Sequence, residues 1–224
     1  MKAPLPPSRS TAVLDAIKHA IITGELRPGQ ALVETDLAGL LGVSKTPVRE
    51  ALKTLAGAGL VTMSPYKGAA VRIVDDATAR HIYDLRRLLE PEALARAVTA
   101  RAGDWPAAAA ALDRAEAAAD EADRSLATRD FHRTLYANSG NPMLTGILDG
   151  LRDQTALVSA AAWRHDPPSW ADETAEHRAI LGAATAGDAA GAAASLRAHI
   201  EAFALRNFPD VPELPHLSNE ESTI

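Results

Sequence analysis

The chain has 224 residues, enough for one large domain or two small ones. Its composition, 47% hydrophobic and 23% charged, is that of a globular protein and excludes global disorder. The absence of cysteine excludes disulfides, cysteine-based zinc sites and thiol catalysis. No stretch approaches ~18 uninterrupted apolar residues and no signal peptide is visible, so we expect no membrane span and a cytoplasmic location.

The net charge of −6 is divided unevenly along the chain. Residues 1–74 carry nine Lys/Arg and five Asp/Glu, a net charge of +4, whereas residues 75–224 carry 14 Arg, no Lys and 24 Asp/Glu, a net charge of −10. A basic first third joined to an acidic remainder predicts that the first part binds a polyanion such as DNA. The alternative is a chance clustering of charges.

The basic part predicts two helices, a three-residue turn, a third helix and a hairpin, in that order. Residues 1–10 are rich in proline and are expected to form a flexible arm, and Ser44 is the predicted N-cap of the third helix. The predicted elements are a helix from Thr11 to Gly24, a short helix around Leu37–Leu41, a helix over 45–58 and strands over 60–63 and 69–74. This order is typical of a winged helix-turn-helix domain, which we place at residues 11–74.

The acidic part has helical periodicity throughout. Breaks at Gly, Asp and Pro divide it into predicted helices over 76–101, 105–121, 123–138, 142–164, 170–186 and 188–207. Residues 75–208 are therefore expected to form an all-helical domain, and the polar, proline-rich residues 209–224 a loosely ordered tail. The expected fold class is mainly α, a winged helix-turn-helix followed by a helical bundle.

The helix predicted over 45–58 has two chemically different faces. At 100° per residue its apolar residues fall on one side, and its cations and one hydroxyl on the other. The apolar side holds Val48, Ala51, Leu52 and Leu55, and the polar side holds Lys45, Thr46, Arg49 and Lys53. Arg and Lys donate to guanine O6 and N7 in the major groove, so this polar side, with Ser44 and a hairpin tip at Lys67-Gly68, forms the candidate DNA-binding set. The alternative is a solvated basic face on a structural helix.

Three histidines lie on the apolar stripes of three different predicted helices. His132 lies near Leu135, His177 shares a face with Ile180 and Leu181, and His199 shares one with Leu196 and Phe203. Because apolar stripes face the core of a bundle, the three imidazoles are expected to converge. Neutral imidazole is the commonest protein ligand of divalent metals, so these three residues are candidate metal ligands. The alternative is that each is a core histidine satisfied by its neighbours.

Two runs in the basic part are distinctive, Gly24-Glu25-Leu26-Arg27-Pro28-Gly29 and Leu41-Gly42-Val43-Ser44-Lys45-Thr46-Pro47-Val48-Arg49-Glu50-Ala51-Leu52. They resemble the DNA-binding domain of the GntR family of bacterial transcription regulators. The resemblance implies that Arg49 reads guanine and that Thr46 contacts the phosphate backbone. The family usually has arginine where this chain has Lys45. Lysine keeps the charge but loses the bidentate fork, so looser base selection is expected at this contact.

The acidic part carries the runs Leu85-Arg86-Arg87-Leu88-Leu89-Glu90-Pro91, Phe131-His132-Arg133 and Glu176-His177-Arg178-Ala179-Ile180-Leu181. They resemble the effector-binding (FCD) domain of the FadR-like subgroup, which implies a bundle of six or seven helices. The resemblance implies an effector pocket formed by Arg86, Thr128, His132, His177 and His199. Arg86 would suit a carboxylate effector. The alternative role of Arg86 is an ion pair with Glu90 at i+4.

The resemblance also bears on a metal. Metal-binding members of the subgroup have an aspartate one turn before the first histidine, where this chain has Thr128. Asp130 is expected on the opposite face and cannot replace it. A divalent metal such as Zn²⁺ would have three histidines and open positions, with one negative charge fewer and weaker affinity. Other members bind their effector without metal, so both possibilities stay open.

We expect a sequence-specific DNA-binding regulator, a repressor, that binds a palindromic operator as a homodimer, because a two-fold dimer enlarges the sequence that is read. A small organic acid in the pocket is expected to shift the orientation of the DNA-binding domains. One alternative is a metal-dependent hydrolytic enzyme using the three histidines. Against it, the nearby carboxylates are expected on outward faces, which leaves no general base. A second alternative is an architectural DNA binder without a ligand.

Overall fold

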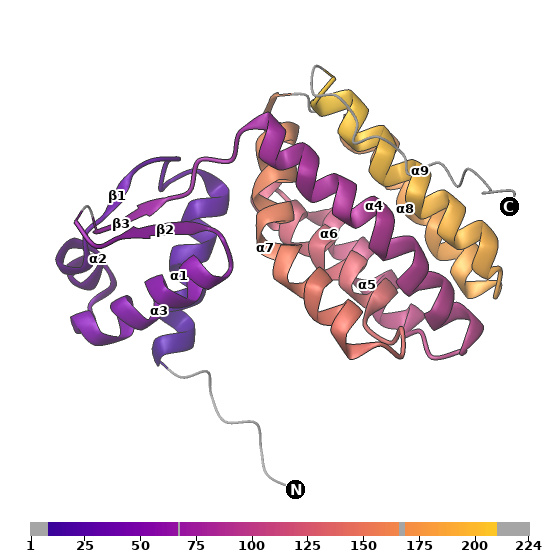
Figure 1. The fold of residues 1–224 in the computed structure, drawn as a ribbon, viewed down its shortest axis with the longest axis horizontal. Coiled ribbons are helices and arrows are strands. Elements are labelled where there is room, and N and C mark those ends of the chain that lie inside the picture. The colour runs from indigo at the N-terminus through magenta and orange to yellow at the C-terminus, as the bar shows by residue number, and fades with distance from the viewer. Residues whose placement is uncertain (1–8, 67, 166–168, 210–224) are drawn as a thin grey trace, which may run out of the picture.

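The computed structural model describes residues 9–66, 68–165 and 169–209. Figure 1 shows two parts joined by the segment between β3 and α4. We call them the head and the body. The head contains α1 (Arg9–Thr23), β1 (Ala31–Leu32), α2 (Glu34–Leu41), α3 (Lys45–Gly57), β2 (Val61–Ser64) and β3 (Gly68–Val71). The body contains α4 (Asp76–Thr99), α5 (Trp105–Ala117), α6 (Glu121–Tyr136), α7 (Pro142–His165), α8 (Ser169–Thr185) and α9 (Ala189–Asn207).

The head is the expected winged helix-turn-helix, with one addition. Its antiparallel sheet has the strand order β1-β3-β2, and Val61 pairs with Val71 at one end of the hairpin. β1 is a strand that sequence analysis missed, because two residues are too few to show alternation. The second hairpin strand ends at Val71 rather than at residue 74, although the N–H of Arg72 still donates to the carbonyl of Leu60 at 2.9 Å beyond the last strand pair.

The head folds around the apolar faces of its helices and strands. Ile17 of α1, Leu52 and Leu55 of α3, and Leu60 before β2 are all fully buried in one cluster. Between α2 and α3, Gly42 adopts a left-handed φ of 65°, a conformation that residues with a Cβ rarely take. This turn sets α3 across α2 and turns the polar face of α3 outward.

The body is a bundle of six helices within the described residues, as expected. Its core includes Phe131 of α6, Ile180 of α8, and Leu196 and Phe203 of α9. Four of its helices begin at an aspartate N-cap, whose side chain accepts a backbone N–H of the first turn. The four are Asp75, Asp104, Asp120 and Asp188. The helix predicted over 105–121 ends earlier, at Ala117, and the cap at Asp120 explains the difference. The chain turns there so that Asp120 can accept the N–H of Asp123 at 2.8 Å.

The head rests on α7 and α6 of the body through its first helix. Lys18 Nζ of α1 lies 2.7 Å from Asp153 Oδ2 of α7, and Ile22 packs with Ala156 and Ala160. Leu157 of α7 belongs to the core cluster of the head. Since Ala156 also lines the central cavity of the body, α7 touches both the head and that cavity.

Three expectations concern the ends of the chain and membranes. Most of the predicted arm (residues 1–8) and of the predicted tail (210–224) lies outside the described residues. α1 begins at Arg9, so the last two residues of the predicted arm are helical instead. No helix in the described part of the chain is long and apolar enough to cross a membrane.

Candidate functional site

The first candidate surface is the outward face of α3. Val48, Ala51, Leu52 and Leu55 are buried in the head, as the helical angles predict. The opposite side carries the exposed residues Ser44, Lys45, Thr46, Arg49 and Lys53. Ser44 occupies the predicted N-cap position, but its side chain makes no capping hydrogen bond within the described part of the chain. The structure therefore brings these five candidate residues together on one exposed face, with the N-terminus of α3 among them.

Two cations of this face are held by carboxylates that sequence analysis did not single out. Arg49 forms a bidentate ion pair with Glu34 at the start of α2, with Nη2 2.8 Å from Oε2. Lys53 Nζ lies 3.0 Å from Glu50 Oε1 on the same helix. The hydrogen bond from Arg49 lowers the pKa of Glu34, aided by the nearby charges, so that this carboxylate is ionised at neutral pH. Both cations thus have a partner within the head.

The hairpin tip supplies one further candidate. Gly68 begins β3 with a left-handed φ of 74°, and a Cβ placed there would meet nothing within 4 Å. The tight turn rather than crowding therefore requires glycine. Lys67, the other candidate at this tip, lies outside the described residues.

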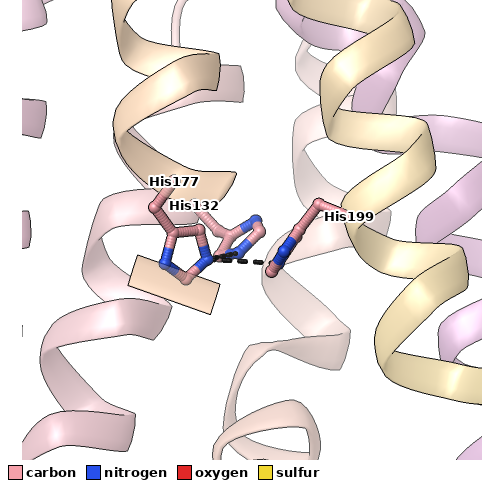
Figure 2. A group of neighbouring side chains, drawn as sticks. All are labelled: His132, His177 and His199. Atoms are coloured by element: carbon pink, nitrogen blue, oxygen red, sulfur yellow. Dashed lines mark hydrogen bonds between the residues drawn. The ribbon is translucent and has the colours of Figure 1, made fainter. Parts of the chain in front are cut away.

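The second candidate site is the histidine cluster in the body, which we define as His132, His177 and His199. Figure 2 shows the three rings converging from α6, α8 and α9. The Nε2 atom of His177 lies 3.2 Å from that of His132 and 3.1 Å from that of His199. All three side chains are buried, at 5%, 0% and 4% exposure. The convergence predicted from the apolar stripes is confirmed.

Two carboxylates fix the proton positions on the outer histidines. His132 Nδ1 lies 2.8 Å from Glu90 Oε2, and His199 Nδ1 lies 2.6 Å from Glu176 Oε2. An ionised carboxylate can only accept, so each Nδ1 carries the proton and donates it. The Nε2 atoms of both rings are then unprotonated, and their lone pairs point at the Nε2 atom of His177.

The environment keeps the cluster uncharged. Burial lowers the pKa of His132 to about 4 despite the attraction of Glu90, and it lowers the pKa of His199 despite that of Glu176. Burial and the two neighbouring imidazoles lower the pKa of His177 further. For Glu90, burial alone would raise the pKa, but Arg86 and His132 outweigh it and lower the pKa to about 2. At neutral pH the site consists of three neutral imidazoles backed by ionised carboxylates.

These residues fit a divalent metal. Imidazole nitrogens bound to one Zn²⁺ at about 2.0–2.1 Å lie roughly 3.3 Å apart in a tetrahedral site, close to the 3.1 and 3.2 Å found here. Without a cation, a single Nε2–H of His177 would have to satisfy two facing lone pairs. The carboxylate behind each outer histidine is the arrangement that orients metal ligands.

Arg86 forms a buried ion pair inside the body. Its Nε lies 2.6 Å from Glu90 Oε1, and both side chains are 4% exposed, so the i+4 ion pair weighed above is formed and buried. The guanidinium also stacks on Tyr83, 4.7 Å from the ring centre. Arg86 still lines the same cavity as His132 and His199, so the structure brings the predicted effector residues together. An anion in this cavity must share Arg86 with Glu90.

Two expectations about the surroundings can be compared with the structure. As expected, Asp130 does not join the cluster and pairs with Arg129 and Arg152 instead. The Oγ1 atom of Thr128 is buried in the cavity wall and has no partner among the described residues. The expectation that nearby carboxylates face outward is wrong. Glu90 and Glu173 are 3% and 2% exposed and line the cavity, and Arg86 and His132 compensate the buried charge of Glu90.

The cavity around the cluster is small. Its volume is about 30 Å³, room for an ion with one or two waters at about 10–15 Å³ each. Arg129 and Arg152 lie in its wall, and Arg129 Nη1 is 2.7 Å from Asp153 Oδ1. The same Asp153 carboxylate bonds Lys18 of the head. A charged path therefore runs from the cavity wall to the head.

Comparison with known proteins identifies the two parts. The model of the bacterial regulatory proteins of the gntR family matches residues 9–71, and the FCD domain model matches residues 81–202. The chain belongs to the GntR family. This GntR regulator is 33% identical over 196 residues to an HTH-type transcriptional regulator in an unstable DNA locus of Streptomyces ambofaciens, covering 83% of this chain and 79% of the relative.

Solved structures agree with this assignment. A GntR transcriptional regulator from Rhodococcus sp. RHA1 has a TM-score of 0.74 and 26% identity, covering 92% of this chain and all of that chain. McbR of Escherichia coli has a TM-score of 0.72 at 23% identity over 91% of this chain and 99% of its own, and shares the fold. The GntR regulator thus has a DNA-binding helix-turn-helix and an effector-binding FCD domain. Its relatives are transcription regulators and not enzymes, so the hydrolase alternative is wrong.

Sequence reasoning missed Glu34, Glu176 and Glu173, and it treated Glu90 only as a partner of Arg86. A signal for Glu90 was present, because it lies on the same stripe of α4 as Tyr83 and Leu94. A charged residue on a buried stripe implies a buried partner. Glu34 gave no such signal, since its partner Arg49 lies in another helix beyond a turn.

Proposed function

We propose that this GntR regulator is a repressor that binds a palindromic operator as a homodimer through α3, and that a small organic acid bound in the body controls it. The observation that carries the proposal is the exposed face of α3, whose N-terminus has no side-chain cap among the described residues. This face carries Ser44, Lys45, Thr46, Arg49 and Lys53. Such a face donates to guanine in the major groove and to phosphates beside it. Lys67 and Gly68 are proposed to contact the backbone from the wing. Bacterial DNA lies in the cytoplasm, so the proposal includes that location.

Apolar residues exposed on the body support a dimer. Leu85 and Leu88 of α4 are 44% and 54% exposed, and Met143 and Ile147 of α7 are 79% and 53% exposed. α4 and α7 pack against each other, so these side chains belong to neighbouring helices. Burying them against a second copy would remove apolar surface from water. Light scattering should give twice the monomer mass for the wild type, and a shift toward monomer for Leu88→Asp.

We propose that the histidine cluster holds a divalent metal such as Zn²⁺, with His132, His177 and His199 as ligands and Thr128 beside an open position. When bound, such an ion supplies positive charge that can attract an anionic ligand. Elemental analysis of protein purified without chelator should find close to one metal per chain in the wild type. His177→Ala should remove it, whereas His81→Ala on the exposed side of α4 should not. Metal-free wild type would contradict this part of the proposal.

The size of the cavity restricts how an organic acid could act. At about 30 Å³ the cavity admits no metabolite unless a wall moves. A ligand that needs a rearranged wall binds one arrangement of the body better than another, which is what shifts an equilibrium. Arg129 and Arg152 are in that wall, and Asp153 connects Arg129 to Lys18. We propose this path as the route by which the ligand alters the head, with a coupling of typically ~1–3 kcal/mol.

The proposal is tested in two steps. Selection from random duplexes should enrich a palindrome, and reporter expression under that site should rise when the regulator is deleted. A thermal-shift panel of small organic acids, with and without added Zn²⁺, should then identify a ligand that raises the melting temperature and changes operator affinity. If no acid raises the melting temperature with or without Zn²⁺, the alternative of an architectural DNA binder without a ligand is favoured. If selection enriches no sequence, the regulator does not read DNA as proposed.

A further inference from the structure

The ion pair between Arg49 and Glu34 uses one particular edge of the guanidinium group. Arg49 Nε lies 3.0 Å from Oε1 and 3.1 Å from Oε2 of Glu34, and Nη2 lies 2.8 Å from Oε2. Glu34 is the first residue of α2, where the positive end of the helix dipole favours a carboxylate. The contact therefore connects the first helix of the helix-turn-helix unit to the second through side chains.

The edge that Glu34 leaves available is the one that guanine requires. A guanidinium group has five coplanar N–H donors, one on Nε and two on each Nη. Glu34 accepts from Nε and from one hydrogen of Nη2, so both hydrogens of Nη1 and the second hydrogen of Nη2 remain. Those donors form the end-on fork that matches O6 and N7 of guanine. The carboxylate and a guanine can thus hold the same arginine at the same time.

We propose that Glu34 is a positioning residue for base reading: by clamping the Nε–Nη2 edge of Arg49, it aims the end-on fork at guanine. This inference rests on the proposed DNA-reading role of α3. A flexible arginine loses several rotatable bonds when it docks, and holding it beforehand reduces that cost. The carboxylate also repels phosphates, which weakens binding wherever no guanine meets the fork. Glu34 would therefore raise specificity in two ways.

A purely structural role does not account for the placement of this pair. α2 and α3 are already joined by the buried contacts of Leu37, Val48 and Leu52 in the head core. The pair itself is solvent-accessible, with 54% of the Arg49 side chain and 30% of the Glu34 side chain exposed. Exposed ion pairs contribute little to stability. A carboxylate this close to a DNA-facing surface opposes non-specific binding, so its benefit must lie in recognition.

The test compares two duplexes with the full-length protein at one fixed salt concentration. One duplex carries the site that wild type selects from a random pool, and the other carries the same bases scrambled. For Glu34→Gln we expect about tenfold weaker binding to the selected site and equal or tighter binding to the scrambled duplex. The matched control is Glu50→Gln, which removes a carboxylate from the same surface and frees Lys53. Glu50→Gln should raise the affinity for both duplexes by the same factor and leave the ratio of the two affinities unchanged.

A base analogue shows whether the effect passes through Arg49 and guanine. Replacing the guanine of the site by 7-deazaguanine removes the N7 acceptor and should abolish most of the difference between wild type and Glu34→Gln. If Glu34→Gln lost the same factor of affinity on both duplexes, the ratio of the two affinities would be unchanged and the proposal for Glu34 would be overturned. Its failure is distinct from that of the DNA-reading role, since an unchanged ratio for Arg49→Ala would overturn the latter. Melting temperatures near that of wild type establish that each variant is folded.

Discussion

The head and the body each contain an arginine–glutamate pair, and the two pairs differ in what they can do. Arg49 and Glu34 in the head are 54% and 30% exposed, whereas Arg86 and Glu90 in the body are both 4% exposed. The exposed arginine keeps donors available for a polyanion. The buried one cannot leave its partner without an uncompensated charge in the core. The two pairs thus differ in burial and not in residue type, and burial decides whether the arginine can donate to a partner outside its own domain.

Breaking the buried pair should have the largest effect on stability. Glu90→Gln leaves the Arg86 charge buried without a counter-charge and keeps one acceptor where the carboxylate had one for Arg86 and one for His132, so we expect the free energy of unfolding to fall by about 3–5 kcal/mol. Glu92→Gln on the same helix is the matched control, because Glu92 pairs with Arg96 at the same four-residue spacing but is 57% exposed. Its cost should stay below about 1 kcal/mol. Urea denaturation of both variants measures the difference, and equal costs would contradict the distinction between the two kinds of pair.

Acid should destabilise the metal-free body through its histidines. The unfolded chain protonates His132 near its ordinary pKa of 6.5, whereas the folded chain resists protonation until about pH 4. Stability is therefore fully present above pH 6.5 and is lost as the pH falls toward 4, by roughly 3 kcal/mol from this residue. Denaturation in the presence of chelator across this range measures the loss. His81→Gln should keep the same slope, and a flat profile for the wild type would contradict the buried, neutral cluster.

A cation of the head should act on DNA binding without acting on sequence preference. Lys53→Gln is expected to weaken binding to selected and scrambled duplexes alike and to reduce the slope of log affinity against log salt by about one, because one phosphate contact is lost. Fluorescence anisotropy at several salt concentrations measures the slope. A selective loss on the chosen site would instead assign Lys53 to base reading.

Removing the ion pair between Lys18 of the head and Asp153 of the body should have a small effect on stability. Lys18 and Asp153 are 20% and 17% exposed and lie 2.7 Å apart, but Asp153 keeps its bond to Arg129 when Lys18 is removed, so Lys18→Ala should cost only about 1 kcal/mol. If the pair carries the ligand signal, the variant should nevertheless lose much of the ligand-dependent change in operator affinity. Preservation of the full ligand response would remove Lys18 from the proposed route.

The fold was largely predictable because it depends on periodic patterns. The apolar spacing that buries Val48, Leu52 and Leu55 also places α3 correctly, and the stripes carrying the three histidines bring them together. The errors fall where a pattern is too short or a cap decides. β1 has two residues, and Asp120 ends one helix early by capping the next.

The site was predictable only in part, since partners depend on tertiary contacts. Imidazoles on apolar stripes must face inward. Glu90 has its arginine partner four residues earlier on the same helix, but its second partner, His132, lies on α6, and only the packing of α6 against α4 brings the two together. Likewise, nothing in the sequence around Arg49 indicates that Glu34, fifteen residues away, clamps it. Periodicity determines which face a residue occupies, and the packing of the helices determines what it meets there.

The most direct test measures the affinity of wild type, Arg49→Ala and Arg96→Ala for one selected duplex under identical salt. Arg49 and Arg96 are both exposed arginines paired with a glutamate, one in the head and one in the body. The account predicts that Arg49→Ala loses roughly 10–100-fold in affinity, while Arg96→Ala binds like the wild type. Equal affinities for all three folded proteins would contradict the claim that α3 reads the DNA.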